Sequence, residues 1–149
     1  MAILDHHIVV AYDPQPTAAF VAEILGLPEP VTLGHFAAVH VGEVTTLDFV
    51  QHDGPVTSQH YAFLVTEAEF DEIFARIVER KLPYWSDPFH NDPGRINTWD
   101  GGRGVYFDDP NGHNLEILTR PYGTGGTTTA NPHPLVADTR DEVSTADKA

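Results

Sequence analysis

Residues 104–119 read GVYFDDPNGHNLEILT and contain two apolar-rich strand segments separated by a tight turn. The turn sequence DPNG, at residues 109–112, combines residue types that favour β-turns. In the second strand segment the acidic residue Glu116 stands between two apolar residues. The triplet LDF at residues 47–49 repeats this arrangement, which indicates an internally repeated fold.

The order of predicted elements is the same in both halves of the chain. A β-rich run at residues 4–11 leads into a helix that begins after Asp13 and ends at Gly26. A run at residues 60–65 leads into a second helix, which begins with a capping box at Thr66. Short strands follow the helices, at residues 35–41 and 45–50 in the first half and at about 82–85, 104–108 and 114–119 in the second.

A histidine lies at the start of each half. His6 and His60 are 54 positions apart, which gives the period of the repeat. The sequence therefore predicts an α+β domain of two βαβββ modules, at about residues 3–52 and 58–122.

The chain has 149 residues, of which 41% are hydrophobic, as expected for one globular domain. Its 22 acidic and 8 basic residues give a formal net charge of −14, which disfavours binding to nucleic acid and to anionic membranes. No cysteine is present, so disulfides, zinc–thiolate sites and thiol catalysis are excluded. A bound metal must therefore have nitrogen and oxygen ligands.

Residues 123–149 differ from the rest of the chain in composition. They are rich in Thr, Gly, Ala and Asp and contain no Phe, Trp or Tyr, so we expect a flexible C-terminal tail. The alternative is an arm that docks Leu135 and Val136 on a partner subunit. The chain shows no signal-like N-terminus and no apolar run of about 20 residues, so we expect a cytoplasmic protein with no membrane partner.

Side chains alternate across a strand, so each module is expected to turn its bulky apolar face toward its helix. The opposite, concave face then carries four polar residues from the first and last strands of the modules. These are His6, Asp48, His60 and Glu116. Two imidazoles and two carboxylates favour a divalent metal ion, and Fe, Mn, Ni, Zn and Co all suit such ligands. The alternative is that they are ordinary strand residues, hydrogen-bonded to one another and to water.

The chain resembles the vicinal oxygen chelate superfamily of glyoxalases, bleomycin-resistance proteins, fosfomycin-resistance enzymes and extradiol dioxygenases. The resemblance covers nearly all of residues 3–122. It is carried by LDH (4–6), Asp13, Phe20, ILGL (24–27), HYAF (60–63) and VYFDDPNGHNLE (105–116). The DPxG turn that leads to Glu116 is its most specific sign.

The resemblance implies that the two modules form a U-shaped, mixed-sheet cup around a metal, often in a homodimer. It implies that His6, His60 and Glu116 are metal ligands. Asp48 matches the remaining ligand position, where the family more often has Glu or Gln, and its shorter side chain has less reach. Without Asp48, the set is a two-histidine, one-carboxylate triad of the kind that Fe(II) dioxygenases use.

The segment at residues 86–102 is long for a connection between short strands, and long ordered loops often cover sites. We expect it to form a wall or lid of the substrate pocket, with aromatic contacts and a cationic group for an anion. The alternative is a solvated surface loop. The candidate pocket residues are Phe89, Arg95, Trp99 and Arg103, with His113 in the final turn.

Three functions are compatible with these residues. The favoured one is a metal-dependent isomerase or lyase that chelates adjacent oxygens of a small, oxygen-rich molecule, with Glu116 or Asp48 as general base. The second is a ring-cleaving dioxygenase, in which a catecholate and O2 occupy the open positions of an Fe(II) triad. The third is a metal-free protein that sequesters a drug, for which the acidic surface would suit a cationic molecule.

Overall fold

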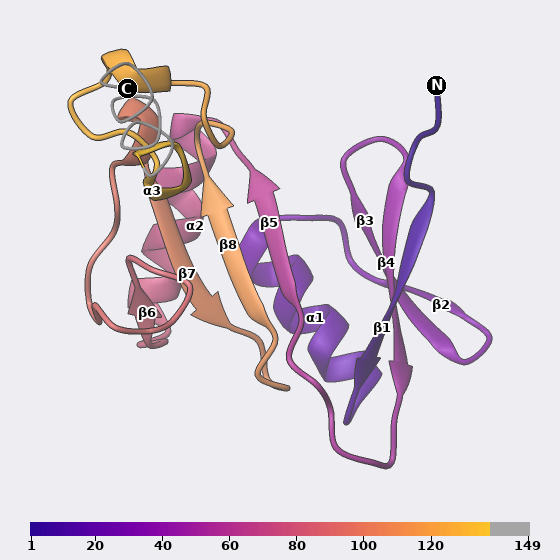
Figure 1. Cartoon of the computed structure of the whole chain (residues 1–149). Helices are drawn as coiled ribbons and strands as arrows, with labels where there is room; N and C mark the ends of the chain where they lie inside the picture. The colour runs from indigo at the N-terminus through magenta and orange to yellow at the C-terminus, as the bar shows by residue number, and fades with distance from the viewer. Residues whose placement is uncertain (138–149) are drawn as a thin grey trace, which may run out of the picture.

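The computed structural model describes residues 1–137, and two four-stranded mixed sheets dominate it (Figure 1). The first module contains β1 (His6–Ala11), α1 (Pro14–Leu25), β2 (Val31–Leu33), β3 (Phe36–Val41) and β4 (Thr45–Gln51). The second contains β5 (His60–Leu64), α2 (Glu67–Glu79), β6 (Tyr84–Trp85), η1 (Trp99–Gly101), β7 (Gly104–Asp108) and β8 (Asn114–Leu118). The short helical turns η2 (Gly126–Thr128) and α3 (Pro134–Ala137) follow β8.

The two sheets have equivalent topologies. Their strand orders are β1-β4-β3-β2 and β5-β8-β7-β6, and in each sheet the first strand pairs in parallel with the last. The α+β fold of two βαβββ modules is therefore confirmed. No residues are assigned to β2 from the sequence, because a strand of three residues is too short to show a periodic pattern.

Local sequence signals begin and end the helices. α1 starts directly after Asp13, although the Asp13 side chain makes no capping hydrogen bond, and it ends at Gly26, whose φ of 68° is left-handed. α2 starts with the predicted capping box: Thr66 Oγ1 accepts from the Glu69 amide at 3.2 Å, and Glu69 Oε2 accepts from the Thr66 amide at 2.8 Å. In the part of the chain that the structure describes, no helix is long and apolar enough to cross a membrane.

One apolar core joins both modules. Alternate strand residues face it, as the sequence predicts: Val9 is 2% exposed, whereas the neighbouring Ile8 is 51% exposed. α1 packs on β3 and β4 and also contacts α2 (Figure 1). The other face of the first sheet is open, whereas that of the second sheet is covered at β7 and β8, where Tyr106 and Glu116 are buried. Core residues include Val9, Ile24 and Phe49 from the first module and Phe70, Phe107 and Ile117 from the second.

His113 connects the two modules. Its side chain is 1% exposed, its Nδ1 accepts from the Gln59 amide at 3.0 Å, and its Nε2 lies 2.8 Å from the Val10 carbonyl oxygen. Because Nδ1 accepts, Nε2 carries the proton and donates to Val10. The ring therefore holds β1 against the start of β5, and this buried position replaces the pocket-lining position expected from the sequence.

Residues 121–137, which we call the C-terminal strap, are anchored by Asp100. The Asp100 carboxylate accepts from the amide of Gly123 at 2.9 Å and from that of His133 at 3.4 Å. The Asp100 amide in turn donates to the Asn131 carbonyl at 2.8 Å. These bonds are made by backbone groups of the strap, so the amino-acid composition of the segment does not indicate that it is anchored.

The strap also packs closely on the backbone that it contacts. A Cβ atom at Gly125 would lie 2.8 Å from both Cα and the carbonyl oxygen of Asp100, closer than any side chain allows. The folded structure thus extends past residue 122, where the sequence predicts a flexible tail to begin. The rest of that predicted tail, residues 138–149, lies outside the described residues.

Replacing His113 with alanine is expected to lower the free energy of unfolding by about 1–3 kcal/mol, because a buried amide and a buried carbonyl lose their partner. Urea unfolding at fixed protein concentration measures the change. His40, exposed on β3, offers a matched control, and His40→Ala should stay within about 0.5 kcal/mol of the wild type. Equal losses in the two variants would contradict the connecting role of His113.

Candidate functional site

His60 and Glu116 lie in contact on the face of the second sheet that points away from the core. The pairing of β5 with β8 places His60 opposite Asn114 and puts the next residue on that face, Ala62, opposite Glu116. His60 Nε2 is 3.1 Å from Glu116 Oε2, and His60 Nδ1 is 3.0 Å from the Asn114 carbonyl oxygen. The Glu116 side chain is 1% exposed and that of His60 is 42% exposed, so the carboxylate is buried beneath a ring that reaches solvent.

The hydrogen bond that His60 donates to the Glu116 carboxylate raises the pKa of His60 above its usual value of 6.5, and partial burial opposes this shift. The protonated ring donates to Glu116 through Nε2 and to the Asn114 carbonyl through Nδ1. In the neutral ring, a proton on Nδ1 leaves the Nε2 lone pair directed at the carboxylate. A metal cation can take the place of the displaced proton between these two groups.

Two tyrosines surround the Glu116 carboxylate. The Tyr122 hydroxyl donates to Oε2 at 2.5 Å and lies 3.3 Å from the Tyr106 hydroxyl. Tyr106 pairs with Glu116 across β7 and β8, and its ring stacks on His60 with 5.7 Å between centroids. Burial, with a smaller contribution from Glu116, raises the pKa of Tyr122 to about 12, so its hydroxyl remains a donor at neutral pH.

The other two predicted ligands, His6 and Asp48, lie on the first sheet. Ile8 is opposite Asp48, and His6 is on the same face of β1 as Ile8. Asp5, at 2.7 Å, raises the pKa of His6, and Asp48 adds a smaller electrostatic contribution. Asp48 Oδ1 is buried and has no hydrogen-bond partner, which is costly for a carboxylate.

Within one chain, the pair of His6 and Asp48 lies apart from the pair of His60 and Glu116. His7 and Tyr61 contact each other, with His7 Nε2 3.0 Å from the Tyr61 hydroxyl, on the core side of β1 and β5. His6 and His60 alternate with them and lie on the opposite faces. Within residues 1–137, no group of three or more His, Asp or Glu side chains is arranged to hold a metal ion.

A cavity of about 620 Å³ opens beside His60. This volume suits a small molecule, and the wall is largely aromatic and apolar. The 86–102 loop contributes to this wall, and two of the proposed pocket residues, Phe89 and Trp99, line it. The aromatic and apolar side chains that form it are Pro88, Phe89, Trp99, Tyr106, Tyr122, Pro134 and Leu135.

The remaining pocket candidates lie away from this cavity. Arg95 is exposed and does not line it. The Arg103 guanidinium binds Glu67 and Asp71 of α2, each at 2.7 Å, because the acidic first turn of that helix lies beside β7. His113 is buried between the modules.

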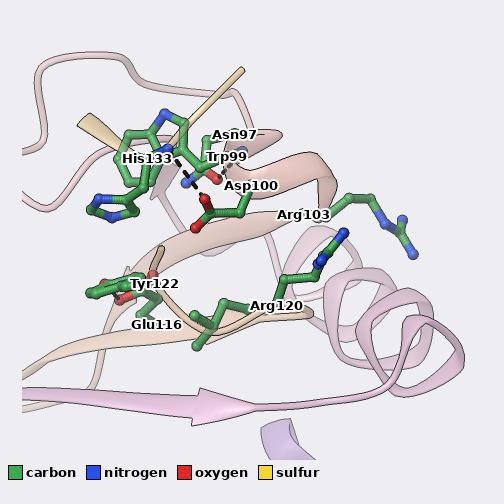
Figure 2. A pocket seen from close by; sticks show the side chains of 9 residues that line it. Asn97, Trp99, Asp100, Arg103, Glu116, Arg120, Tyr122 and His133 are labelled. Carbon is green, nitrogen blue, oxygen red and sulfur yellow. Dashed lines mark hydrogen bonds between the residues drawn. The ribbon is translucent and has the colours of Figure 1, made fainter. Parts of the chain in front are cut away.

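A narrow space of about 10 Å³ separates Glu116 from the loop that carries Asp100 (Figure 2). Figure 2 shows Glu116 and Tyr122 together on one side of this space, with Asp100 and His133 on the other. The Arg103 side chain extends away from Glu116, so it is not directed at the carboxylate.

The sequence did not point to Tyr106, Tyr122 or the strap as parts of the site. Tyr106 had a usable signal, because extending the hairpin from the DPNG turn pairs it with Glu116. Tyr122 and His133 had none. They follow the last strand, and the fold brings them back through bonds to Asp100 that no local motif encodes.

Comparison with known proteins agrees with this fold. The family model for the Glyoxalase/Bleomycin resistance protein/Dioxygenase superfamily matches residues 3–117. The chain belongs to this superfamily. Among curated proteins, none matches the chain.

Solved structures of two oxidases are similar to this superfamily member. Oxidase ChaP-H2 is 55% identical over 84% of this chain and 98% of its own, with a TM-score of 0.82. Oxidase ChaP-H1 is 58% identical over 83% of this chain and 99% of its own, with a TM-score of 0.81. Lactoylglutathione lyase from Agrobacterium tumefaciens, 22% identical over 78% of this chain and 92% of its own, shares the fold with a TM-score of 0.59.

The residues present in this superfamily member fit a divalent metal ion. His60 offers Nε2 beside the buried Glu116 carboxylate, and Asp48 offers a buried oxygen that lacks a partner. Imidazole and carboxylate are ligands that Fe, Mn, Ni, Zn and Co accept. Catalytic metal sites use about three protein ligands, so His60 and Glu116 need at least one more.

The histidine titration can be tested directly. In protein freed of metal with a chelator, NMR should give His60 a pKa above 6.5, and Glu116→Gln should lower it because the carboxylate is lost. A histidine whose pKa is raised by folding stabilises the protein below its unfolded pKa, and this stabilisation is lost as the pH rises through the folded value. A His60 pKa that does not change in Glu116→Gln would rule out the coupling.

Proposed function

We propose that the chain is a metal-dependent oxidase that oxidises a small hydroxylated aromatic molecule, with O2 as the oxidant. The observation that carries the proposal is the contact between His60 and Glu116 beside a cavity with aromatic walls. The identity of 55% and 58% to two oxidases supports oxidation over the other chemistries considered.

Residues in and beside the cavity have distinct roles in this proposal. His60 and Glu116 hold the divalent metal ion, which supplies Lewis acidity and, as Fe(II), reactivity toward O2. Phe89 and Trp99 pack against the aromatic ring of the substrate and exclude water from it. Tyr122, whose hydroxyl stays protonated and donates to Glu116, contributes its aromatic ring to the cavity wall.

We also propose that a second copy of the chain completes the ligand set with His6. The open face of the first sheet that carries Asp48 also carries Ile8, Val31 and Leu33, which are 51%, 46% and 53% exposed. An apolar face of this kind is typical of an interface. Two-fold symmetry would place the first sheet of each copy over the second sheet of the other.

The ligand set across the two copies would be His6 from one copy and His60 with Glu116 from the other. This is the two-histidine, one-carboxylate arrangement of non-haem Fe(II) oxygenases. The pairing also explains why a single chain separates residues that the repeat places at equivalent positions. Each dimer would contain two such sites.

An isomerase or lyase, which the sequence favoured, is the second candidate function. The partnerless Oδ1 of Asp48, on the same face as His6, supports a fourth ligand. A four-residue set suits proton abstraction by Glu116 or Asp48 as general base. Asp48→Asn distinguishes the two candidates, since metal loss equal to that of His60→Ala supports the four-ligand set and retained metal supports the triad.

Metal analysis of protein purified without chelators should find metal in the wild type and little in the His6→Ala and Glu116→Gln variants. Mixing the two variants under mild denaturation and refolding should restore about a quarter of the sites. Half of the random dimers are then mixed, and each holds one intact site and one doubly altered site.

The matched control mixes His60→Ala with Glu116→Gln. Both changes lie on the second sheet, so every site in that mixture stays altered. Restoration in both mixtures, or in neither, would contradict a site shared between copies. A metal-free wild type that binds a cationic drug tightly would contradict the enzyme and support the drug-sequestering alternative.

Trp99→Ala should weaken binding of catechol about threefold to tenfold, because an aromatic contact contributes about 0.5–1.5 kcal/mol. Isothermal titration of catechol into the protein as purified measures the affinity. Arg95→Ala should leave it unchanged, since Arg95 does not line the cavity. An unchanged affinity in Trp99→Ala would contradict the proposal that the 86–102 loop contacts the bound molecule.

A further inference from the structure

The C-terminal strap places a tyrosine hydroxyl on the carboxylate of the proposed site. Tyr122 donates to Glu116 Oε2 at 2.5 Å, whereas His60 Nε2 contacts the same oxygen at 3.1 Å. The match to the superfamily model ends at residue 117, so Tyr122 lies beyond the matched segment. This contact is therefore an addition to the repeated βαβββ scaffold.

The strap holds Tyr122 in place on both sides. Its neighbour Gly123 donates from its amide to the Asp100 carboxylate at 2.9 Å. The ring of His133 packs on that of Tyr122 with 4.1 Å between centroids, and Trp99 packs on His133 at 4.9 Å. The hydrogen bond between Gly123 and Asp100 and the ring contacts with His133 and Trp99 thus fix the position of the Tyr122 hydroxyl.

The hydrogen bond restricts the one soft torsion of the Glu116 side chain. The last torsion of a glutamate is broad, so a carboxylate in a strand can turn between several orientations. A hydroxyl held at 2.5 Å from Oε2 selects the orientation in which that oxygen also meets His60. Groups that orient metal ligands in this way typically affect metal affinity about tenfold to hundredfold.

We infer that Tyr122 is a positioning residue for Glu116, whose hydroxyl fixes the carboxylate toward His60 and so prepares it to bind the metal. The inference rests on the proposed function in one respect, since it takes Glu116 as a metal ligand. Its structural part, the orientation of Glu116, is independent of any metal. Tyr122→Phe tests both parts because it removes one oxygen atom and retains the ring.

The first measurement compares crystal structures of the metal-free wild type and of Tyr122→Phe. The Glu116 carboxylate is expected to rotate away from His60 in the variant, so that the contact at 3.1 Å is lost. A carboxylate that keeps its orientation and its contact with His60 would overturn the inference. Because both proteins are free of metal, the result does not depend on whether the protein binds one.

The second measurement titrates Co²⁺ into full-length dimer-competent protein and follows both affinity and the visible absorption spectrum. Tyr122→Phe should bind Co²⁺ about tenfold to hundredfold more weakly, with an altered spectrum and an unchanged thermal midpoint of the metal-free protein. Tyr61→Phe is the matched control, because its hydroxyl contacts His7 on the core side of β5. Wild-type affinity in Tyr122→Phe, or an equal loss in Tyr61→Phe, would overturn the inference.

Glu116→Gln separates failure of this inference from failure of the proposed function. If the wild type and Glu116→Gln bind Co²⁺ equally, Glu116 is not a ligand, and both the proposed function and the metal part of the inference are wrong. If Glu116→Gln loses Co²⁺ and Tyr122→Phe does not, the proposed function stands and the inference alone fails.

Discussion

Parallel pairing of the first and last strands within each module is the constraint on which the candidate site depends. In the second module it places His60 and Glu116 on one face of adjacent strands, close enough for a contact of 3.1 Å. In the first module the same pairing places His6 and Asp48 on one open face. In the proposed function, each sheet therefore contributes part of the ligand set as a consequence of the topological repeat.

The sequence was sufficient for the fold because its signals were periodic and local. Alternation along the strands indicated which side of each strand is buried, and a capping box at Thr66 marked the start of α2. The same alternation assigned His60 and Glu116 to one face. Alternation missed β2, which has only three residues. The capping signal was wrong at Asp13, whose side chain does not cap α1.

The arrangement of the modules and the strap required information that no local pattern contains. His113 appeared in a turn motif as a pocket candidate, yet it is buried because the two modules pack around it. The sequence suggested Arg103 as an anion-binding group, but in the structure its guanidinium is bound by Glu67 and Asp71 of α2. Tyr122 lies in the site only because a buried aspartate, 22 residues earlier in the sequence, holds the adjacent backbone.

The path of the C-terminal strap depends on a glycine at position 125. Any residue other than glycine there would collide with the backbone of Asp100, which cannot move aside as a side chain can. Homologues that combine Asp at position 100 with Gly at 125 and Tyr at 122 can fold the strap in this way. A side chain at position 125 would force the strap of this chain onto another path after β8, and Tyr122 would lose its place over the Glu116 carboxylate.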